Sequence, residues 1–381
     1  MSEIRRCIFH IPYQPDPVNR PSGTNVRPGK MLQGFKDAGF DVLEVVGDSR
    51  ARRSAITEAK RLISEGASFD FVYSESETMP TMLTDADHLP RHPLMDFSFM
   101  KFCRKNGIPV GLFYRDAYWM FNGFGSQQRK SVHQLLRLLH KFDLWEYKEA
   151  VDVLFVPSEA FGKLVNGRTP SVEKIALPSG CTATNNVMHS HPITAHDDGR
   201  LALLYVGGIS QGEAYDLSDF ISGVAKVEEV SLDLCVRNQE WDRTANYYSP
   251  LLNSSIRVHH VSGEGLVPLY DQADIGALIF RPSPYRDLCM PVKLFEYLAA
   301  GLPVLALRGT AAGDFVEQNG VGWTIDAAQE EIVAILMHLC KHPEEVERAR
   351  ARSLEVAHAN TWEERARQVA RSLGTGGTAR P

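Results

Sequence analysis

The sequence has 381 residues, with 41 lysines and arginines against 47 aspartates and glutamates, which gives a formal net charge of −6. Hydrophobic residues make up 44% and charged residues 23%, so the chain can bury a core and is not disordered as a whole. An acidic chain is a poor candidate for a duplex-DNA binder, and we expect no nucleic acid among its partners. The length indicates two domains.

The cysteines and the N-terminal residues indicate the cellular compartment in which the protein is expected. The six cysteines are scattered, without a CxxC pair and without histidines at zinc spacing, so we expect neither a zinc module nor a disulfide framework. The N-terminal residues lack the apolar region of a signal peptide, and no apolar run is long enough to span a membrane. The sequence therefore predicts a cytoplasmic protein whose only membrane contact would be peripheral, at the inner face.

In the first half of the chain, short apolar runs alternate with stretches of helical periodicity. A loop rich in proline and glycine over Arg20–Lys30 separates the first strand from a helix over Lys30–Phe40. This alternation predicts βαβ units and a mostly parallel sheet. The expected strands are Arg6–Pro12, Asp41–Gly47, Phe69–Ser74, Pro109–Tyr114 and Val151–Pro157.

The second half repeats the pattern after a polar, aperiodic linker from about Asn185 to Arg200. We expect two Rossmann-like α/β domains, 1–184 and 185–358, and a last helix around 360–375 that packs back on the first domain. Trp362, Ala366, Val369 and Leu373 give that helix its apolar spacing. The expected strands are Leu201–Val206, Ser231–Val236, Ile256–Val261, Ile275–Phe280, Pro303–Leu307 and Gly322–Ile325.

The densest group of polar side chains follows the strand Ile275–Phe280. Pro291 suits the first turn of a helix, and Gly301 suits its end. Lys293 and Glu296 stand three residues apart and share one face of that helix. A helix N-terminus with a lysine attracts phosphate, and a glutamate one turn on could accept hydrogen bonds from ribose hydroxyls. The pair equally fits an ordinary surface ion pair.

The segment PVKLFEYLAAGLPVLA resembles the C-domain signature of GT-B glycosyltransferases near family 4. VPSEAF, KIALPSG, LLYVGGIS, LYDQADIGALIF and NGVGWTI resemble other segments of that family and stand in the family's order. The common family motif has two glutamates eight positions apart, whereas here Glu296 fills the second place and Leu288 the first. The sequence is thus similar to the subgroup with a P-x-K-L-x-E-Y pattern.

The resemblance implies a set of donor-binding residues in the C-terminal domain. The place of the missing glutamate could be taken by Asp287 or Arg286. The basic pair that the family often carries after its first C-domain strand is absent after Gly207 and Gly208, which shifts phosphate binding to Lys293 and Arg237. The expected donor-binding set is Gly207, Gly208, Arg237, Asp287, Lys293, Glu296 and Tyr297.

The N-terminal domain offers candidates at the ends of two strands. Asp116 follows the strand Pro109–Tyr114 and could act as the base for an acceptor hydroxyl, or anchor it. It could equally be a buried aspartate paired with Arg115, or one that makes local turn bonds. Arg115, Tyr118 and Trp119 are further candidates for the acceptor side of the site, and the two aromatic rings could stack on sugar faces.

The loop after the first strand adds Gly23, Thr24, Asn25 and Arg27, which could contact donor phosphates or the acceptor. A solvent-exposed turn fits these residues equally well.

A helix over Gln128–Lys148 has an apolar stripe and several basic residues. It could be a core helix with a solvated basic side, or a docking surface for anionic lipid or a lipid-pyrophosphate acceptor. Asp85, Asp87 and the histidine pair His259–His260 fit loop and strand positions better than a metal site, and we expect no bound metal.

The leading interpretation is a GT-B glycosyltransferase that moves a sugar from a UDP- or GDP-sugar to a glycan or lipid-linked acceptor in the synthesis of a surface polysaccharide. The resemblance implies retention of anomeric configuration and no cofactor. Two alternatives remain open: a nucleotide-sugar 2-epimerase, which needs no acceptor, and a non-catalytic protein that binds nucleotide sugars. A nicotinamide-dependent oxidoreductase does not fit, because no strand is followed by GxGxxG.

Overall fold

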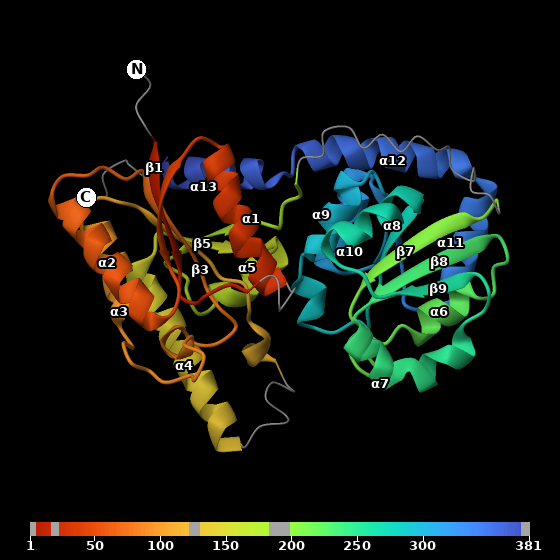
Figure 1. The fold of residues 1–381 in the computed structure, drawn as a ribbon, viewed down its shortest axis with the longest axis horizontal. Helices are drawn as coiled ribbons and strands as arrows, with labels where there is room; N and C mark the ends of the chain where they lie inside the picture. The colour runs from red at the N-terminus through yellow and green to blue at the C-terminus, as the bar shows by residue number, and fades with distance from the viewer. Residues whose placement is uncertain (1–4, 17–22, 122–129, 183–198, 375–381) are drawn as a thin grey trace. The chain divides into compact units, whose positions relative to one another are not determined.

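The computed structural model describes residues 5–16, 23–121, 130–182 and 199–374. It divides the chain into two compact units, one made of residues 1–180 with 362–381 and the other of 181–361. Each unit is a parallel sheet covered by helices (Figure 1). Most of the expected linker, residues 183–198, lies outside the described residues, as does the tail 375–381.

Unit 1 has a six-stranded parallel sheet in the order β2-β1-β3-β4-β5-β6. Five strands coincide with expected ones to within a few residues. The sixth, β6, was not predicted, since it is short and partly exposed at the sheet edge. The strands are β1 (Arg6–Ile11), β2 (Asp41–Val46), β3 (Phe71–Glu75), β4 (Val110–Phe113), β5 (Val153–Val156) and β6 (Glu173–Ala176).

The helices of unit 1 cover both faces of this sheet. The first and last helices lie on one face, where they pack against each other, while α2, α3 and α4 lie on the other (Figure 1). The helices are α1 (Gly23–Asp37), α2 (Ser49–Ser64), α3 (Met95–Lys105), α4 (Lys130–Ala150), α5 (Glu159–Asn166) and α13 (Trp362–Gly374), with short 3₁₀ turns η1 (Thr81–Leu83) and η2 (Tyr118–Met120).

The segment expected to be a loop over Arg20–Lys30 is helical from Gly23 onward, so that prediction was wrong over its described part. Pro28 lies in the second turn of α1, where the missing N–H removes one hydrogen bond near the helix start. Contact with α13 fixes the helix: a Cβ at Gly34 would lie 2.4 Å from the carbonyl oxygen of Trp362. Tertiary contact thus overrides a loop-like composition.

Unit 2 repeats the design with the strand order β12-β11-β10-β7-β8-β9. Its strands are β7 (Leu201–Gly207), β8 (Val230–Val236), β9 (Ile256–His259), β10 (Ile275–Leu278), β11 (Val304–Leu307) and β12 (Gly322–Ile325). Its helices are α6 (Ser218–Val224), α7 (Asn238–Tyr248), α8 (Val267–Gln272), α9 (Val292–Ala299), α10 (Ala311–Asn319), α11 (Gln329–Lys341) and α12 (Pro343–His358), with 3₁₀ turns η3 (Ser249–Leu251), η4 (Gly263–Leu266) and η5 (Arg286–Leu288).

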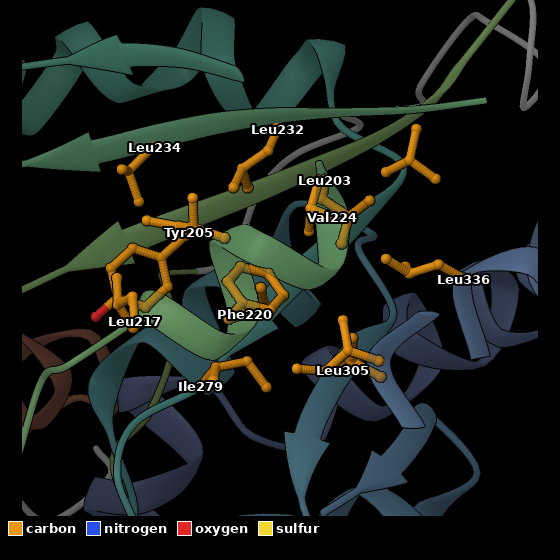
Figure 2. Packing of buried hydrophobic residues seen from close by; sticks show 14 of the residues in the cluster. Leu203, Tyr205, Leu217, Phe220, Val224, Leu232, Leu234, Ile279, Leu305 and Leu336 are labelled. Carbon is orange, nitrogen blue, oxygen red and sulfur yellow. The ribbon is translucent and has the colours of Figure 1, made fainter. Parts of the chain in front are cut away.

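Both faces of the unit 2 sheet are buried, which explains why its strands are continuous apolar runs. Alternate residues of β7 serve the two faces: Leu203 and Tyr205 pack with α6 and α11, whereas Leu204 packs with α9. Figure 2 shows the first of these cores, in which Phe220 of α6 and Leu336 of α11 close over the strands.

The strand order of each sheet indicates where a ligand would bind. In an open α/β sheet, ligands bind beyond the carboxyl ends of strands where the order reverses. The order reverses between β1 and β3 in unit 1, and between β7 and β10 in unit 2. A ligand site is therefore expected in the loops that follow these four strands.

Candidate functional site

Helix α9 carries the lysine and glutamate singled out from the sequence. Pro291 occupies the N-cap, and Leu294, Phe295 and Leu298 are buried on the side facing the sheet. Gly301, with φ of +68°, reverses the chain after the helix and leads into β11. This arrangement leaves Lys293 and Glu296 half-buried on the other side.

Lys293 and Glu296 form an ion pair, and Tyr270 of α8 joins them. The Tyr270 hydroxyl donates to Glu296 Oε2 at 3.0 Å, and Lys293 Nζ lies 3.3 Å from the same hydroxyl oxygen. Burial and the Glu296 charge raise the pKa of Tyr270, so it stays a neutral donor. Tyr270 was not predicted as a site residue, although it lies in the segment LYDQADIGALIF that resembles the glycosyltransferase family.

Tyr297 has a structural role in this arrangement. It has no exposed surface, and its hydroxyl accepts a hydrogen bond from the backbone N–H of Val206 at 2.9 Å. A Cβ at Gly276 would lie 2.5 Å from the Tyr297 ring, so the glycine lets β10 and α9 approach closely. Tyr297 thus ties α9 to β7, and its buried ring does not face a ligand.

The loop after β7 and the start of α7 meet at the same edge of the unit 2 sheet. The Tyr205 hydroxyl donates to the carbonyl of Gly208 at 2.7 Å, and a Cβ at Gly207 would lie 2.6 Å from that hydroxyl. Arg237 pairs with Glu240, whose other oxygen accepts from the backbone N–H of Ile209 at 3.1 Å. Arg237 is about half exposed, at 54%, and stands beside the loop that begins at Gly207.

The loop after β10 contributes Arg286 to the lining of a cavity of about 420 Å³. Arg286 lies over the ring of Tyr215 at 4.1 Å, and Asp287 accepts from the backbone N–H of Ser283 at 3.2 Å, a local turn bond. The cavity lies within unit 2 and is lined by Ile209, Ser210, Gln211, Glu213, Ala214, Tyr215, Glu240, Arg243, Thr244 and Arg286.

In unit 1, the carboxyl ends of β3 and β4 bring Asp116 beside Thr78. The Thr78 hydroxyl donates to Asp116 Oδ2 at 2.7 Å, and Asp116 is half-buried. Arg115 pairs with the fully buried Glu75. Glu77 was missed in the sequence analysis. Its pKa is raised by burial, with the nearby Asp116 charge adding to the effect. Two carboxylates therefore stand at this edge.

Of the aromatic candidates, only Tyr118 is partly exposed. Burial raises its pKa to about 12, and the charges of Asp116 and Glu77 act in the same direction. Trp119 is 1% exposed and stacks on His140, with ring centroids 5.2 Å apart. Its indole N–H donates to the Tyr114 hydroxyl at 3.0 Å. The expectation that Trp119 offers a sugar platform does not match this buried position.

The candidates on α1 are dispersed. Arg27 is buried at 4% exposure, lies over the Phe113 ring at 3.7 Å and approaches Glu75 at 3.6 Å. It therefore sits within unit 1 instead of in a loop. Asn25 accepts from the backbone N–H of Asp16 at 3.0 Å. Gly23 and Thr24 form the first residues of the helix.

A buried Ser–His–Asp arrangement in unit 1 was not foreseen. His10 bonds Ser74 Oγ at 2.8 Å and Asp96 Oδ1 at 2.9 Å, while Arg52 also pairs with Asp96. Ser74 has no exposed surface and His10 and Asp96 have 1–2%. A catalytic nucleophile must be accessible to its substrate, and this serine is not. The group is therefore structural and holds β1, β3, α2 and α3 together.

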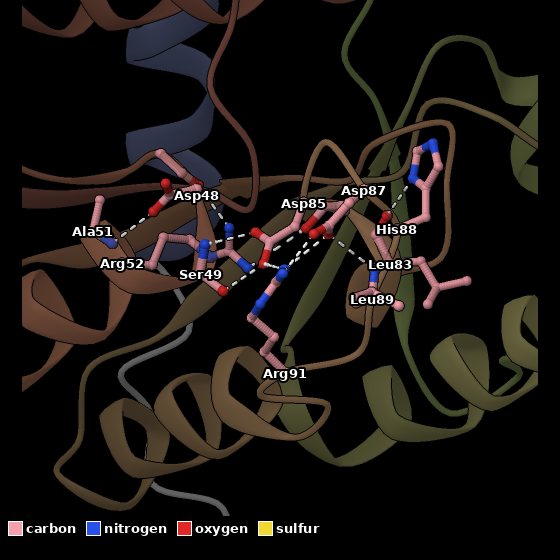
Figure 3. A network of polar contacts seen from close by, with 12 residues as sticks. Asp48, Ser49, Ala51, Arg52, Leu83, Asp85, Asp87, His88, Leu89 and Arg91 are labelled. Atoms are coloured by element: carbon pink, nitrogen blue, oxygen red, sulfur yellow. Dashed lines mark hydrogen bonds and ion pairs between the residues drawn. The ribbon is translucent and has the colours of Figure 1, made fainter.

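Among the residues that the structure describes, no group of three or more metal-ligating side chains comes together. Figure 3 shows what Asp85 and Asp87 do: Asp85 accepts from the backbone N–H of Ser49 at 2.7 Å, and Asp87 pairs with Arg91. His259 bonds Asp233 at 2.6 Å, and His260 bonds the Val236 carbonyl at 2.9 Å. No described helix is both long and apolar enough to cross a membrane.

Comparison with known proteins finds a family match over about a third of the chain. Residues 228–356 match the family described as glucosyltransferase 3-like, C-terminal domain. A stretch of 55 residues is 37% identical to glucosyltransferase 3 of Streptococcus parasanguinis. It covers 14% of this chain and 17% of that protein's length.

Solved structures match over nearly the whole chain. Sucrose-phosphate synthase of Thermosynechococcus elongatus superposes with a TM-score of 0.64 at 14% identity, covering 98% of this chain and all of that one. HepE of Anabaena, solved with UDP and glucose, gives 0.62 at 12% identity over 97% of this chain and 100% of its own. WaaG, a glycosyltransferase of lipopolysaccharide biosynthesis, gives 0.56 at 14% identity, covering 98% and 100%.

The expected fold is confirmed: two Rossmann-like units with six parallel strands each form a GT-B protein. The family match in unit 2, which includes β10, α9 and the Lys293–Glu296 pair, supports a glycosyltransferase.

Proposed function

We propose that the protein transfers a sugar from a nucleotide-sugar donor to a glycan or lipid-linked acceptor. Unit 2 would bind the donor and unit 1 the acceptor. The observation that carries the proposal is the Lys293–Glu296–Tyr270 group at the start of α9, next to the strand-order reversal of unit 2.

The chemistry of this group suits a nucleoside diphosphate. The first N–H groups of α9 have no acceptor within the helix, and its dipole favours an anion there. Lys293 adds a positive charge beside them, and Arg237 stands at the end of β8 in the same sheet edge. Glu296 offers a carboxylate acceptor to ribose hydroxyls, and the Tyr270 hydroxyl, which donates to Glu296, orients that carboxylate. The α9 N–H groups, Lys293 and Arg237 would stabilise the charge that develops on the leaving diphosphate.

The proposal also specifies the nucleotide base of the donor and the class of the acceptor. HepE is solved with UDP and glucose, and a second HepE structure contains UDP-glucose, which favours a UDP-sugar over a GDP-sugar. WaaG acts in lipopolysaccharide biosynthesis, which favours a polysaccharide or lipid-linked acceptor. Retention of anomeric configuration follows from the resemblance of the PVKLFEY segment. Asp116 and Glu77 are the acidic side chains that we assign to the acceptor hydroxyl.

The test is calorimetric titration of UDP and GDP into the wild type and into Lys293→Ala and Glu296→Ala. Loss of one charge-assisted hydrogen bond costs about 1.5–3 kcal/mol. Each variant should therefore bind the preferred nucleotide about tenfold or more weakly. Lys341→Ala, at an exposed lysine in the last turn of α11, is the matched control and should bind as the wild type does.

Equal nucleotide affinity in all four proteins would remove the assigned donor site. Incubation with UDP-sugars then separates the alternatives. Release of UDP that depends on an added glycan or lipid-linked acceptor supports transfer. A new epimer without acceptor would identify an epimerase, and tight binding without turnover would identify a binding protein.

A further inference from the structure

Helix α4 carries large apolar side chains that remain exposed among the described residues of unit 1. The exposed fractions are 43% for Val132, 53% for Leu135, 60% for Leu138 and 58% for Trp145. Their spacings of three and seven residues keep them on one side of the helix, over a length of about 20 Å at 1.5 Å per residue. We call these four residues the α4 apolar face.

The opposite side of α4 anchors the helix in unit 1. Leu136, Leu144 and Tyr147 are between 1% and 6% exposed, and α4 packs against α3 and η2. The N-terminal turns of α4 extend past the other described helices and strands of unit 1 (Figure 1). These contacts hold the helix in unit 1, and among the described residues its apolar side is exposed to solvent.

Two lysines alternate with the apolar residues along the helix. Lys141 follows Leu138 by three residues and precedes Trp145 by four, and Lys148 follows Trp145 by three, so all lie next to one another. Within the described part of the chain, neither lysine forms an ion pair with a carboxylate. Glu149 is the exposed acid near the end of this side.

The charge of the whole chain is divided unevenly between the two units. Unit 1 has 28 lysines and arginines against 23 acids, a net charge of +5, whereas unit 2 has 13 against 24, a net charge of −11. The apolar face thus belongs to the basic unit of an acidic protein, and a negatively charged surface would attract unit 1 while repelling unit 2.

We propose that α4 docks unit 1 on an anionic bilayer surface, with the α4 apolar face in the headgroup region and Lys141 and Lys148 on lipid phosphates. An exposed tryptophan and leucines flanked by lysines are the composition of helices that lie in a membrane interface. An aromatic ring with a polar N–H is suited to that depth. This interaction goes beyond sugar transfer and does not depend on the donor site.

A bilayer fits these observations better than a protein partner. The apolar side chains lie on the convex outer side of a helix instead of lining a groove, so a fluid surface can surround them. The excess of positive charge in unit 1 also suits a surface whose negative charge is spread out, since each lysine near such a surface contributes separately.

Sedimentation of the full chain with vesicles tests the proposal. The probes are vesicles of phosphatidylcholine alone and of equimolar phosphatidylcholine and phosphatidylglycerol. The wild type should bind the second kind and much less the first. Leu135→Gln with Leu138→Gln should weaken binding about tenfold or more, because each leucine loses its burial in lipid. Lys141→Gln and Lys148→Gln should weaken it about fivefold each, and Glu149→Gln should strengthen it.

Trp145 gives a readout confined to α4. Its fluorescence should shift to the blue on binding of mixed vesicles, whereas Trp145→Phe should bind nearly as well without that shift. Met337→Gln removes an exposed apolar residue from α11 in unit 2, at 46% exposure, and is the matched control. The thermal unfolding of each variant shows whether the chain is folded. Nucleotide affinity, measured separately, distinguishes this test from that of the donor site.

Three results would overturn the proposal. The first is a wild type that does not sediment with mixed vesicles. The second is a Leu135→Gln and Leu138→Gln protein that sediments as the wild type does. The third is a wild-type dimer that this double variant converts to monomers, which would make the face an interface between copies of the chain.

Discussion

Asp143 of α4 offers a sharp test of how burial shapes unit 1. It is 4% exposed, and its Oδ2 accepts from the backbone N–H of Thr81 at 2.8 Å and from the Thr81 hydroxyl at 3.0 Å. Its other oxygen is buried without a hydrogen bond among the described residues. Asp143→Asn keeps the size and an acceptor for Thr81 but removes the negative charge.

Burial raises the pKa of Asp143 to about 7 from 3.8; Asp96 and Glu146 act in the same direction, and the Thr81 bonds oppose them. A group whose folded pKa is raised stabilises the fold fully below its unfolded pKa. This contribution is lost as the pH rises through the folded pKa. The wild type should lose on the order of 4 kcal/mol between about pH 4 and pH 7, at about 1.36 kcal/mol per pH unit.

The asparagine does not titrate in this range, so Asp143→Asn should be more stable than the wild type near about pH 8 and should lack this slope. Hydrogen exchange of the α4 amides at a series of pH values reports the opening of unit 1 alone. Asp37→Asn, at an exposed position of α1, is the control and should keep the wild-type slope. An Asp143→Asn protein that is less stable at about pH 8, or that keeps the slope, would refute the reasoning.

Two further substitutions test one residue in each unit. Asp116→Asn keeps an oxygen for the Thr78 hydroxyl, so the protein should stay folded and bind nucleotide while sugar transfer falls about 10²-fold; full transfer activity would leave Asp116 without a catalytic role. Gly276→Ala should destabilise unit 2 by about 1–3 kcal/mol in thermal unfolding, because the added Cβ would lie 2.5 Å from the Tyr297 ring. Gly29→Ala, whose Cβ would meet open space on α1, is the control and should stabilise instead.

The strands could be predicted from the sequence because both faces of each sheet are buried. A strand such as Leu201–Gly207 is apolar at successive positions, and this run is visible without any knowledge of its neighbours. The edge strand Glu173–Ala176 has no such run and was missed. The start of α1 was missed for a different reason: its glycines and Pro28 favour a loop, and only contact with α13 stabilises the helix.

Some of the site residues could likewise be predicted from the sequence, and others could not. Lys293 and Glu296 could be predicted as neighbours, since both lie on one helix and their spacing determines the contact. Tyr270 and Glu77 could not, because each meets its partners across the sheet edge from a different loop or helix. Trp119 and Arg27 have side chains typical of binding sites, yet both are buried, and burial depends on packing between distant segments.

The uneven charge of the two units sets a condition on the proposed donor site. A nucleoside diphosphate would approach a unit with a net charge of −11, so attraction at long range is not available to it. Charges more than about 10 Å away are largely screened at about 0.1 M salt, whereas contacts at hydrogen-bond distance are not. Affinity must then come from groups that touch the phosphates, namely the α9 N–H groups and Lys293. The ion pair of Lys293 with Glu296 keeps that cation at the helix start before the ligand arrives.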